Sequence, residues 1–345
     1  MQISKSRRGL LSFCDYTSFD SMNMDNFNTL VTIFAAITLF IYGLQSFGKE
    51  IQSFGADKLS KWIKKFTQLP LGGFLLGGVV TAIIQSSTLV SSLTVTMVNA
   101  GIITFRDSLL ILLGANIGTT STAWIVSFDN AMFGPLFIAL GSVLSMLPWR
   151  IKVFGKSIFY FGFIFFSLSL ISYTMEPIKN NPLLIDILAK ATNPMLGVLY
   201  GIAVTVIVQS SSVVVGLVIV LVQQGVLGLD AAIPIVVGAN VGTTSTALLV
   251  SLKMNSMSKL VALSASLFNL VGVLLILPFF GVLEDFVTNS TQQVAFQVAI
   301  AYTISNTITS LFFLVLLKPT VRLLHKTPWY KRSMEETILN TLEHH

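Results

Sequence analysis

Two kinds of short polar patch interrupt an otherwise apolar sequence, and each kind occurs twice. The first is Gln-Ser-Ser followed by a hydroxyl residue, at 85–88 and again at 209–212. The second is Gly-Ala-Asn-x-Gly-Thr-Thr-Ser-Thr, at 114–122 and again at 238–246. Their hydroxyl and amide groups supply neutral oxygens that can bind sodium and donors that can bind an oxyanion. Where such patches end or break helices, the free helix N-termini also favour an anion.

Both patches lie in one long repeat. Residues 73–127 and 197–251 align at a constant offset of 124 without a gap, with 25 identities in 55 positions. Ser and Thr patches also serve helix packing in membranes, which is the alternative explanation. Because a buried unpaired amide is costly and each patch recurs with its amide, we favour a binding site where the patches meet at mid-membrane. The candidate anion- and sodium-binding residues are Gln85, Ser86, Ser87, Thr88, Asn116, Thr119, Thr120, Ser121, Gln209, Ser210, Ser211, Ser212, Asn240, Thr243, Thr244 and Ser245.

The composition indicates a membrane protein. Of 345 residues, 53% are hydrophobic and 10% charged, against about 25% charged in soluble domains, and the mean hydropathy is +0.81. The net charge of +6 lies in loops, where it indicates orientation rather than nucleic-acid binding. The single Cys14 allows no internal disulfide. With no metal-ligand cluster and no nucleophile–base pair, the sequence predicts neither an enzyme nor a cofactor other than co-transported sodium.

Apolar runs between polar loops predict an all-α polytopic membrane protein with one transport domain, 27–317. Repeat one (71–147) and repeat two (195–280) each contain two half-length arms around Gln-Ser-Ser, which predicts a re-entrant hairpin, followed by a broken transmembrane helix. Glycines are expected to permit the breaks, with close packing as the alternative, at Gly114, Gly118, Gly238 and Gly242. The remaining segments are a tail 1–26, extra helices 27–47, 154–171 and 294–317, an amphipathic helix 48–69, a basic cytoplasmic tail 318–341, and 342–345, which resembles the start of an expression tag.

The loop charges predict the orientation. Basic loops favour the cytoplasm, which places residues 49–65, 150–156 and 253–259 inside, and the acidic loop at 284–285 outside. This assignment is consistent only if each Gln-Ser-Ser segment enters and leaves on one side. The repeats then have inverted topology, as in many secondary transporters. The N-terminus is expected outside and the C-terminus in the cytoplasm, with the chain in the cell inner (plasma) membrane.

No Asp, Glu, Lys, Arg or His lies in the core of a predicted span, which favours sodium coupling over proton coupling. The second arm of the first hairpin is richer in hydroxyls than that of the second, and we expect it to line a permeation path or an extra ion site, through Ser91, Ser92, Thr94 and Thr96. One face of the last span is also polar, with packing as its expected role, at Thr303, Asn306, Thr307 and Ser310.

The doubled motifs resemble the type II sodium–phosphate cotransporter family. The resemblance extends over roughly 71–275 and includes the segment at Phe268-Asn269, although the matching Asn after repeat one is absent, with Ser145-Met146 in that region. It implies sodium-driven import of inorganic phosphate at the repeat interface, with Gln-Ser-Ser residues contacting phosphate and sodium. It also implies a PhoU-like domain after the last span, which fits a native chain that continues past residue 341, and it is compatible with a homodimer.

Two other functions fit the same residues. The first is sodium-coupled transport of another anion, such as sulfate or a dicarboxylate. The second is a membrane sensor that binds phosphate without transporting it. A competition panel and a comparison of binding with turnover separate these from phosphate import.

Overall fold

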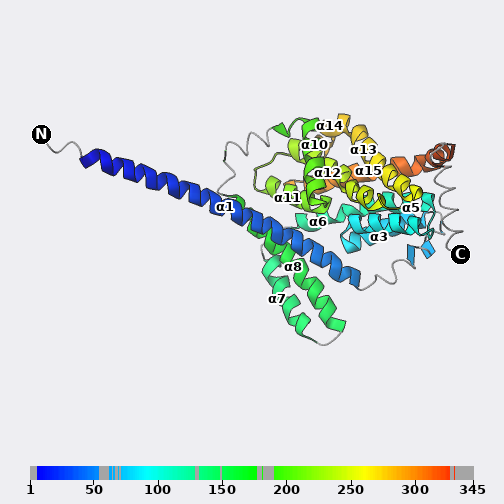
Figure 1. Ribbon diagram of the computed structural model, residues 1–345, viewed down its shortest axis with the longest axis horizontal. Coiled ribbons are helices and arrows are strands. Elements are labelled where there is room, and N and C mark those ends of the chain that lie inside the picture. The colour runs from blue at the N-terminus through cyan, green and yellow to red at the C-terminus, as the bar shows by residue number, and fades with distance from the viewer. Residues whose placement is uncertain are drawn as a thin grey trace.

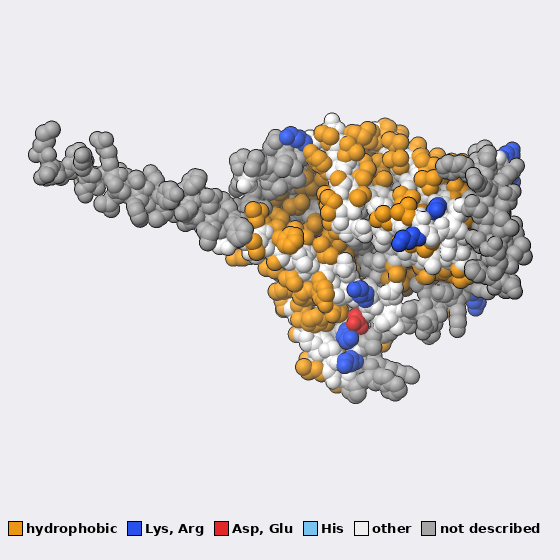
Figure 2. All heavy atoms as spheres, viewed as in Figure 1, with side chains coloured by type: hydrophobic (Ala, Val, Ile, Leu, Met, Phe, Trp, Pro, Cys, Tyr) orange, Lys and Arg blue, Asp and Glu red, His pale blue; other side chains and the backbone are white. Residues whose placement is uncertain are grey.

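The computed structural model describes residues 6–53, 62–63, 65–66, 69, 71–128, 132–147, 150–176, 181, 190–326 and 330. All regular structure in these residues is helical, and six helices are long and apolar enough to cross a membrane. Hydrophobic side chains cover much of the visible face, and the Lys and Arg side chains lie in a few separate places (Figure 2). The prediction of an all-helical, multi-pass membrane protein is confirmed for the described residues.

The first helix, α1 (Ser6–Ser53), is longer than the sequence predicted. Residues 6–26, predicted as a tail, are helical, and residues 48–53, predicted to start an amphipathic helix, continue α1. Half of the predicted amphipathic helix 48–69 lies outside the described residues. The membrane-compatible part of α1 is 28–53. No Pro lies near either predicted boundary, and the helix continues through residues of weak helix propensity such as Asn26, Asn28 and Gly48.

Helices α7 (Phe133–Met146) and α8 (Arg150–Met175) pack against each other, and α1 packs on α8 (Figure 1). Helix α8 is longer than the predicted span 154–171, whereas α7 has only 14 residues, fewer than the roughly 20 needed to cross a bilayer. An exposed ion pair joins α1 to α8, with Lys156 Nζ 3.3 Å from Glu50 Oε1.

The two repeats produce similar series of helices. Repeat one gives α3 (Gly72–Ile84), α4 (Ser87–Asn99), α5 (Phe105–Thr119) and α6 (Ser121–Ser127). Repeat two gives α10 (Pro194–Val208), α11 (Ser211–Gln223) and α12 (Leu229–Ser251). They are followed by α13 (Ser256–Ile276), the short 3-10 helix η1 (Leu277–Phe279), α14 (Phe280–Ser290) and α15 (Val294–Lys326), which extends past the predicted end at 317.

The expected broken helix exists in repeat one only. Helix α5 ends at Thr119 and α6 begins at Ser121, where the Thr120 amide donates to Ile117 O at 3.0 Å in a tightened turn. Helix α12 runs unbroken through the same motif, so the predicted second break is wrong. Hydroxyls can remain inside a helix when they donate to carbonyls one turn back, as Thr243 Oγ1 does to Ala239 O at 3.1 Å.

The motif glycines allow close helix packing. A Cβ on Gly114 would collide with the carbonyl oxygen of Phe74, and one on Gly238 with that of Val198. The first arm of each hairpin therefore lies directly against the motif helix of its own repeat, α3 on α5 and α10 on α12. The packing alternative, rather than the expected break, explains these glycines.

The second arms of the hairpins pack on the motif helix of their own repeat and also on the opposite repeat. Helix α4 contacts α12 and α13, and α11 contacts α6 and α15. At the far end of α4, the Asn255 amide donates to Asn99 Oδ1 at 2.8 Å, and Ser258 Oγ donates to Val95 O at 3.1 Å. The interleaving brings the polar motifs of both repeats into one region of the molecule.

Candidate functional site

Both Gln-Ser-Ser motifs form helix–turn–helix tips with the same backbone. Gln85 and Gln209 end the first arms in the left-handed region, with φ of 58° and 57°, and are the only described non-glycine residues with positive φ. Ser86 and Ser210 then cap the second arms: the Leu89 amide donates to Ser86 Oγ at 3.3 Å, and the equivalent distance at Ser210 is 3.5 Å. Non-glycine residues adopt positive φ rarely and at some energetic cost, so both tips are held in a specific, repeated geometry.

The two tips contact each other and the short helix α6. Thr88 Oγ1 of the first tip donates to the carbonyl oxygen of Gln209 in the second at 3.4 Å. From α6, Thr122 Oγ1 lies 3.2 Å from Ser212 Oγ. The structure therefore brings the Gln-Ser-Ser motifs, 124 residues apart in sequence, to one place.

The Gln85 side chain is buried and bonded at both ends. Its Nε2 donates to Ala82 O and, at 2.7 Å, to Ser121 Oγ, while its Oε1 accepts from Thr122 Oγ1 at 2.7 Å. We call this three-residue arrangement of Gln85, Ser121 and Thr122 the Gln85 latch. It ties the tip of the first hairpin to the start of α6, immediately after the tightened turn.

The equivalent residues in repeat two are apart. Gln209 is exposed, while Ser245 Oγ and Thr246 Oγ1, which match the hydroxyls of Ser121 and Thr122, are buried without a hydrogen-bond partner. An unpaired buried hydroxyl costs about 1–3 kcal/mol. Repeat two therefore contains the residues of an equivalent latch, Gln209, Ser245 and Thr246, but they are not bonded to one another, and we call this second latch open.

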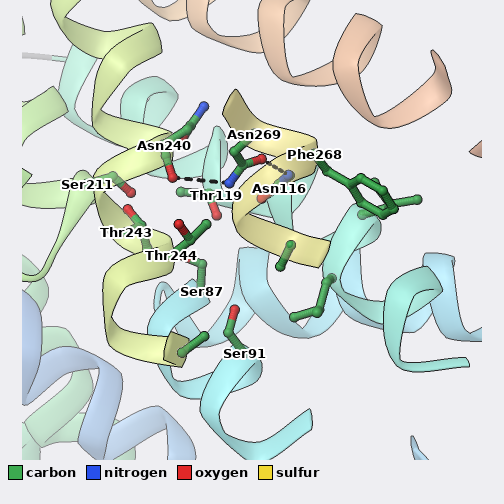
Figure 3. A pocket seen from close by; sticks show the side chains of 14 residues that line it. Ser87, Ser91, Asn116, Thr119, Ser211, Asn240, Thr243, Thr244, Phe268 and Asn269 are labelled. Atoms are coloured by element: carbon green, nitrogen blue, oxygen red, sulfur yellow. Dashed lines mark hydrogen bonds between the residues drawn. The ribbon is translucent and has the colours of Figure 1, made fainter. Parts of the chain in front are cut away.

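A small cavity of about 20 Å³ lies between the repeats, beside the tips (Figure 3). Volume of this size holds about one water molecule. Its polar lining comes from both repeats and carries no charged side chain: Ser87, Ser91, Asn116, Thr119, Ser211, Asn240, Thr243, Thr244 and Asn269. The hydroxyl of Ser211 is buried without a hydrogen-bond partner.

Amide side chains link four helices across this cavity. Asn116 Nδ2 donates to Asn269 Oδ1 at 2.6 Å, and Asn269 Nδ2 donates to Asn240 O at 3.1 Å (Figure 3). Asn240 Nδ2 continues the chain to Asn306 Oδ1 at 2.7 Å, and Asn240 Oδ1 accepts from Tyr302 at 2.6 Å. These bonds satisfy amides that are costly to bury unpaired and fix α5, α12, α13 and α15 relative to one another.

A larger cavity of about 210 Å³ lies on another side of the tips. Gln85, Ser86 and Ser210 line it from the hairpins, and α1 contributes Gln45, Lys49 and Gln52. The exposed Lys49 is the one cation among its lining residues. Because consecutive tip residues line different cavities, the two tips separate the larger cavity from the smaller one.

The structure thus gathers most of the predicted residues at these two cavities. Of the others, Thr88, Ser121 and Ser212 bond at the tips and α6, and Thr120 Oγ1 donates to Ile117 O at 2.8 Å. Gln209 is exposed, and the Ser245 hydroxyl is buried without a partner. In the hydroxyl-rich arm, Ser91 lines the small cavity, whereas Thr94 and Thr96 donate to their own helix backbone.

The candidate list omitted several residues that the structure places at the cavities: Asn269, Tyr302 and Asn306 in the amide chain, and Gln45, Lys49 and Gln52 on α1. Asn269 and Asn306 carried a signal, since each is an amide inside an apolar run. Lys49 carried none, because a basic residue after a span is an ordinary orientation signal.

An all-helical membrane protein with an internal repeat, hairpin tips and neutral polar side chains gathered between its helices has the architecture of a membrane transporter. The family model for the Na+/Pi-cotransporter matches residues 39–173 and 180–284, and the chain belongs to this family.

Curated relatives agree with that assignment. The chain is 30% identical over 299 residues to "Uncharacterized protein YqeW" of Bacillus subtilis, covering 86% of this chain and 97% of that one. It is 31% identical over 261 residues to "Putative inorganic phosphate export protein YjbB" of Escherichia coli K12, covering 74% of this chain but only 48% of YjbB. Human "Sodium-dependent phosphate transport protein 2B" is 37% identical over 103 residues, 28% of this chain and 15% of that one. No solved structure matches the chain.

Proposed function

We propose that this protein is a secondary transporter that couples sodium to the movement of inorganic phosphate by alternating access. Membership of the Na+/Pi-cotransporter family supports phosphate as substrate. The observation that carries the proposal is the meeting of two Gln-Ser-Ser tips between a larger and a smaller cavity. Phosphate binds at the tips, and the two repeats, inserted as inverted re-entrant hairpins, open it to one side at a time.

Phosphate fits the larger cavity by its chemistry. The first amides of α4 and α11 have no partner within their own helices, and their positive dipole ends favour an oxyanion. The Ser86 and Ser210 hydroxyls lie on the same side, and Lys49 adds a cation at the exposed rim. Phosphate entering here replaces its hydration by amide and hydroxyl donors, with Lys49 raising its local concentration.

Sodium fits the neutral oxygens around the smaller cavity. Side-chain amides and hydroxyls from both repeats line it, and no carboxylate does. A hard cation prefers such oxygen ligands. Because the same helices hold the tips, sodium bound there stabilises the tip geometry that phosphate needs, which couples the two ligands.

The open and closed latches describe how access alternates. In the present state, Gln85 is bonded to Ser121 and Thr122, whereas Gln209 is exposed and Ser245 and Thr246 lack partners. The opposite state is expected to exchange the two arrangements, with the second latch closed and the first open. Equal backbones at the tips allow this exchange without refolding.

We propose that transport runs inward. Each sodium ion that moves inward down a potential of 100 mV supplies about 2.3 kcal/mol, enough for several ions to concentrate phosphate. With α1 oriented so that Lys49 faces the cytoplasm, the state described here has the larger cavity on the inner side. The name of YjbB specifies export, so direction must be measured.

The test is uptake of radiolabelled phosphate into proteoliposomes with sodium or choline outside, in both gradient directions. Sodium-dependent uptake that Gln85→Ala and Gln209→Ala abolish is expected. Uptake that ignores the sodium gradient contradicts coupling, and faster sodium-driven efflux than uptake contradicts import. Sulfate and dicarboxylate competitors added to the same assay identify the anion, and phosphate binding without any flux identifies a sensor.

A further inference from the structure

A third and separate polar cavity, of about 10 Å³, lies between α12, α13 and α15. Its polar lining is Asn240, Asn269, Ser305, Asn306 and Thr309. Three of these residues come from α15, which is outside both repeats. The first two also line the cavity at the tips, so the two cavities share a wall.

The Ser305 hydroxyl marks this cavity as more than a packing defect. Ser305 is only 2% exposed, and its Oγ has no hydrogen-bond partner. Ser310, on the same helix, is also buried with an unpaired hydroxyl, but it does not line the cavity. Burying an unpaired hydroxyl is costly, and in Ser305 that group faces a space of about one water molecule.

The hydrogen bonds around the cavity leave acceptors available. Asn240 Oδ1 accepts from Tyr302, Asn269 Oδ1 from Asn116, and Asn306 Oδ1 from Asn240. Each amide oxygen has two lone pairs, so one bond to each leaves a second lone pair. The Ser305 and Thr309 hydroxyls can rotate to present their oxygens as well. Several neutral oxygens around a space for one small particle are the ligand set of a small hard cation.

From these contacts we infer that Asn240, Asn269, Ser305, Asn306 and Thr309 form a sodium site in addition to the sites at the tips. The cation bound there holds α15 against α12 and α13 and thereby fixes Asn240 at the wall shared with the tip cavity. Its part in transport rests on the proposed sodium coupling, whereas its binding does not. Ser305 and Thr309 are ligands supplied by the last helix, which the repeat symmetry would not reveal.

The test measures sodium binding to the purified protein in detergent, without phosphate. The melting temperature is recorded during titration with sodium, potassium or choline chloride, and its rise reports binding. Ser305→Ala and Thr309→Val remove one ligand oxygen each while nearly preserving shape. Each is expected to weaken sodium about tenfold or more, since an interaction with a charged group is lost. Ser310→Ala is the matched control and is expected to leave the sodium titration unchanged.

Tryptophan fluorescence provides a second measurement of sodium binding. Trp124 Nε1 donates to Thr303 Oγ1 at 3.0 Å, two positions before Ser305 on α15. Sodium is expected to change the emission of the wild type, and Trp124→Phe is expected to lose that change.

Equal sodium titrations in Ser305→Ala, Thr309→Val and wild type overturn the inference, as does a wild type that responds to sodium no more than to choline; the cavity then holds only water. These outcomes are distinct from failure of the proposed function. A wild type that transports phosphate with sodium while Ser305→Ala keeps its sodium affinity leaves the transporter proposal standing. Weaker sodium binding in Ser305→Ala, together with no phosphate flux in the wild type, supports the sodium site and contradicts the transporter proposal.

Discussion

The tips of the two repeats share a backbone and differ in what their side chains do. Gln85 and Gln209 have nearly the same φ, and the Ser that follows each caps the next helix. Yet Gln85 is 7% exposed and bonded to two hydroxyls of α6, whereas Gln209 is exposed. The symmetry therefore holds for the main chain and fails for the latch.

The same contrast explains why one motif helix is interrupted and the other continuous. Residues 118–123 and 242–247 have identical sequences, so sequence alone cannot interrupt one of them. Only in repeat one does a glutamine bond to the hydroxyls after the tightened turn. In the proposed alternating-access cycle, we expect the interruption to accompany a closed latch and to move to the other repeat in the opposite state.

The largest expected effect concerns the amide chain. Asn240→Ala removes a donor to Asn306 and an acceptor for the buried Tyr302, whereas Asn116→Ala removes only a donor to Asn269. We expect a loss of about 3 kcal/mol in unfolding free energy for the first and about 1 kcal/mol for the second, measured by denaturant unfolding in detergent. Equal losses would show that the two motif asparagines have equivalent surroundings.

The second-largest effect on stability is expected at the two latch glutamines, Gln85 and Gln209. Gln85→Ala removes the side-chain bonds to Ser121 and Thr122, whose hydroxyls keep Gly118 O and Ser212 Oγ as partners, and is expected to cost about 2 kcal/mol of stability. Gln209→Ala should cost close to nothing because its side chain is exposed. Both variants should lose phosphate uptake if each glutamine is used in one state of the cycle. A Gln209→Ala variant as destabilised as Gln85→Ala would contradict an open second latch.

Removing a single hydroxyl is expected to change the stability of the protein in opposite directions in the two repeats. Thr122→Val removes a bonded hydroxyl and should destabilise the protein by about 1 kcal/mol. Thr246→Val removes an unpaired buried hydroxyl and should stabilise it by a similar amount, about 1 kcal/mol. Thermal unfolding of the two variants side by side measures the difference. Destabilisation by both would mean that Thr246 is bonded in the dominant state.

The smallest effect is expected at the rim of the larger cavity. Lys49→Gln removes an exposed cation and should weaken phosphate binding only a few-fold, with the difference fading as salt is raised. Lys156→Gln is the matched control, because Lys156 pairs with Glu50 and does not line the cavity. A phosphate titration at low and high ionic strength makes the comparison, and a salt-independent loss would argue against an electrostatic role for Lys49.

The sequence by itself determined the membrane class, the repeat and the family. Low charge and high hydropathy require burial in lipid, and identical polar motifs at a fixed offset identify a duplicated unit. It also located the tips, because each apolar arm around Gln-Ser-Ser is too short to cross a bilayer and serine can cap the helix that follows. Helix boundaries were less accurate, as α1 shows, since a helix continues wherever no residue stops it.

Only the tertiary structure decided which side chains are paired. Whether Gln85 or Gln209 reaches its hydroxyls depends on how the hairpins pack against the opposite repeat, and identical local sequences carry no record of that. The roles of Asn269, Asn306 and Lys49 likewise depend on which distant helices meet. Local sequence fixes the backbone of a tip, because capping acts over a few residues; the partners of a buried amide are fixed by long-range packing.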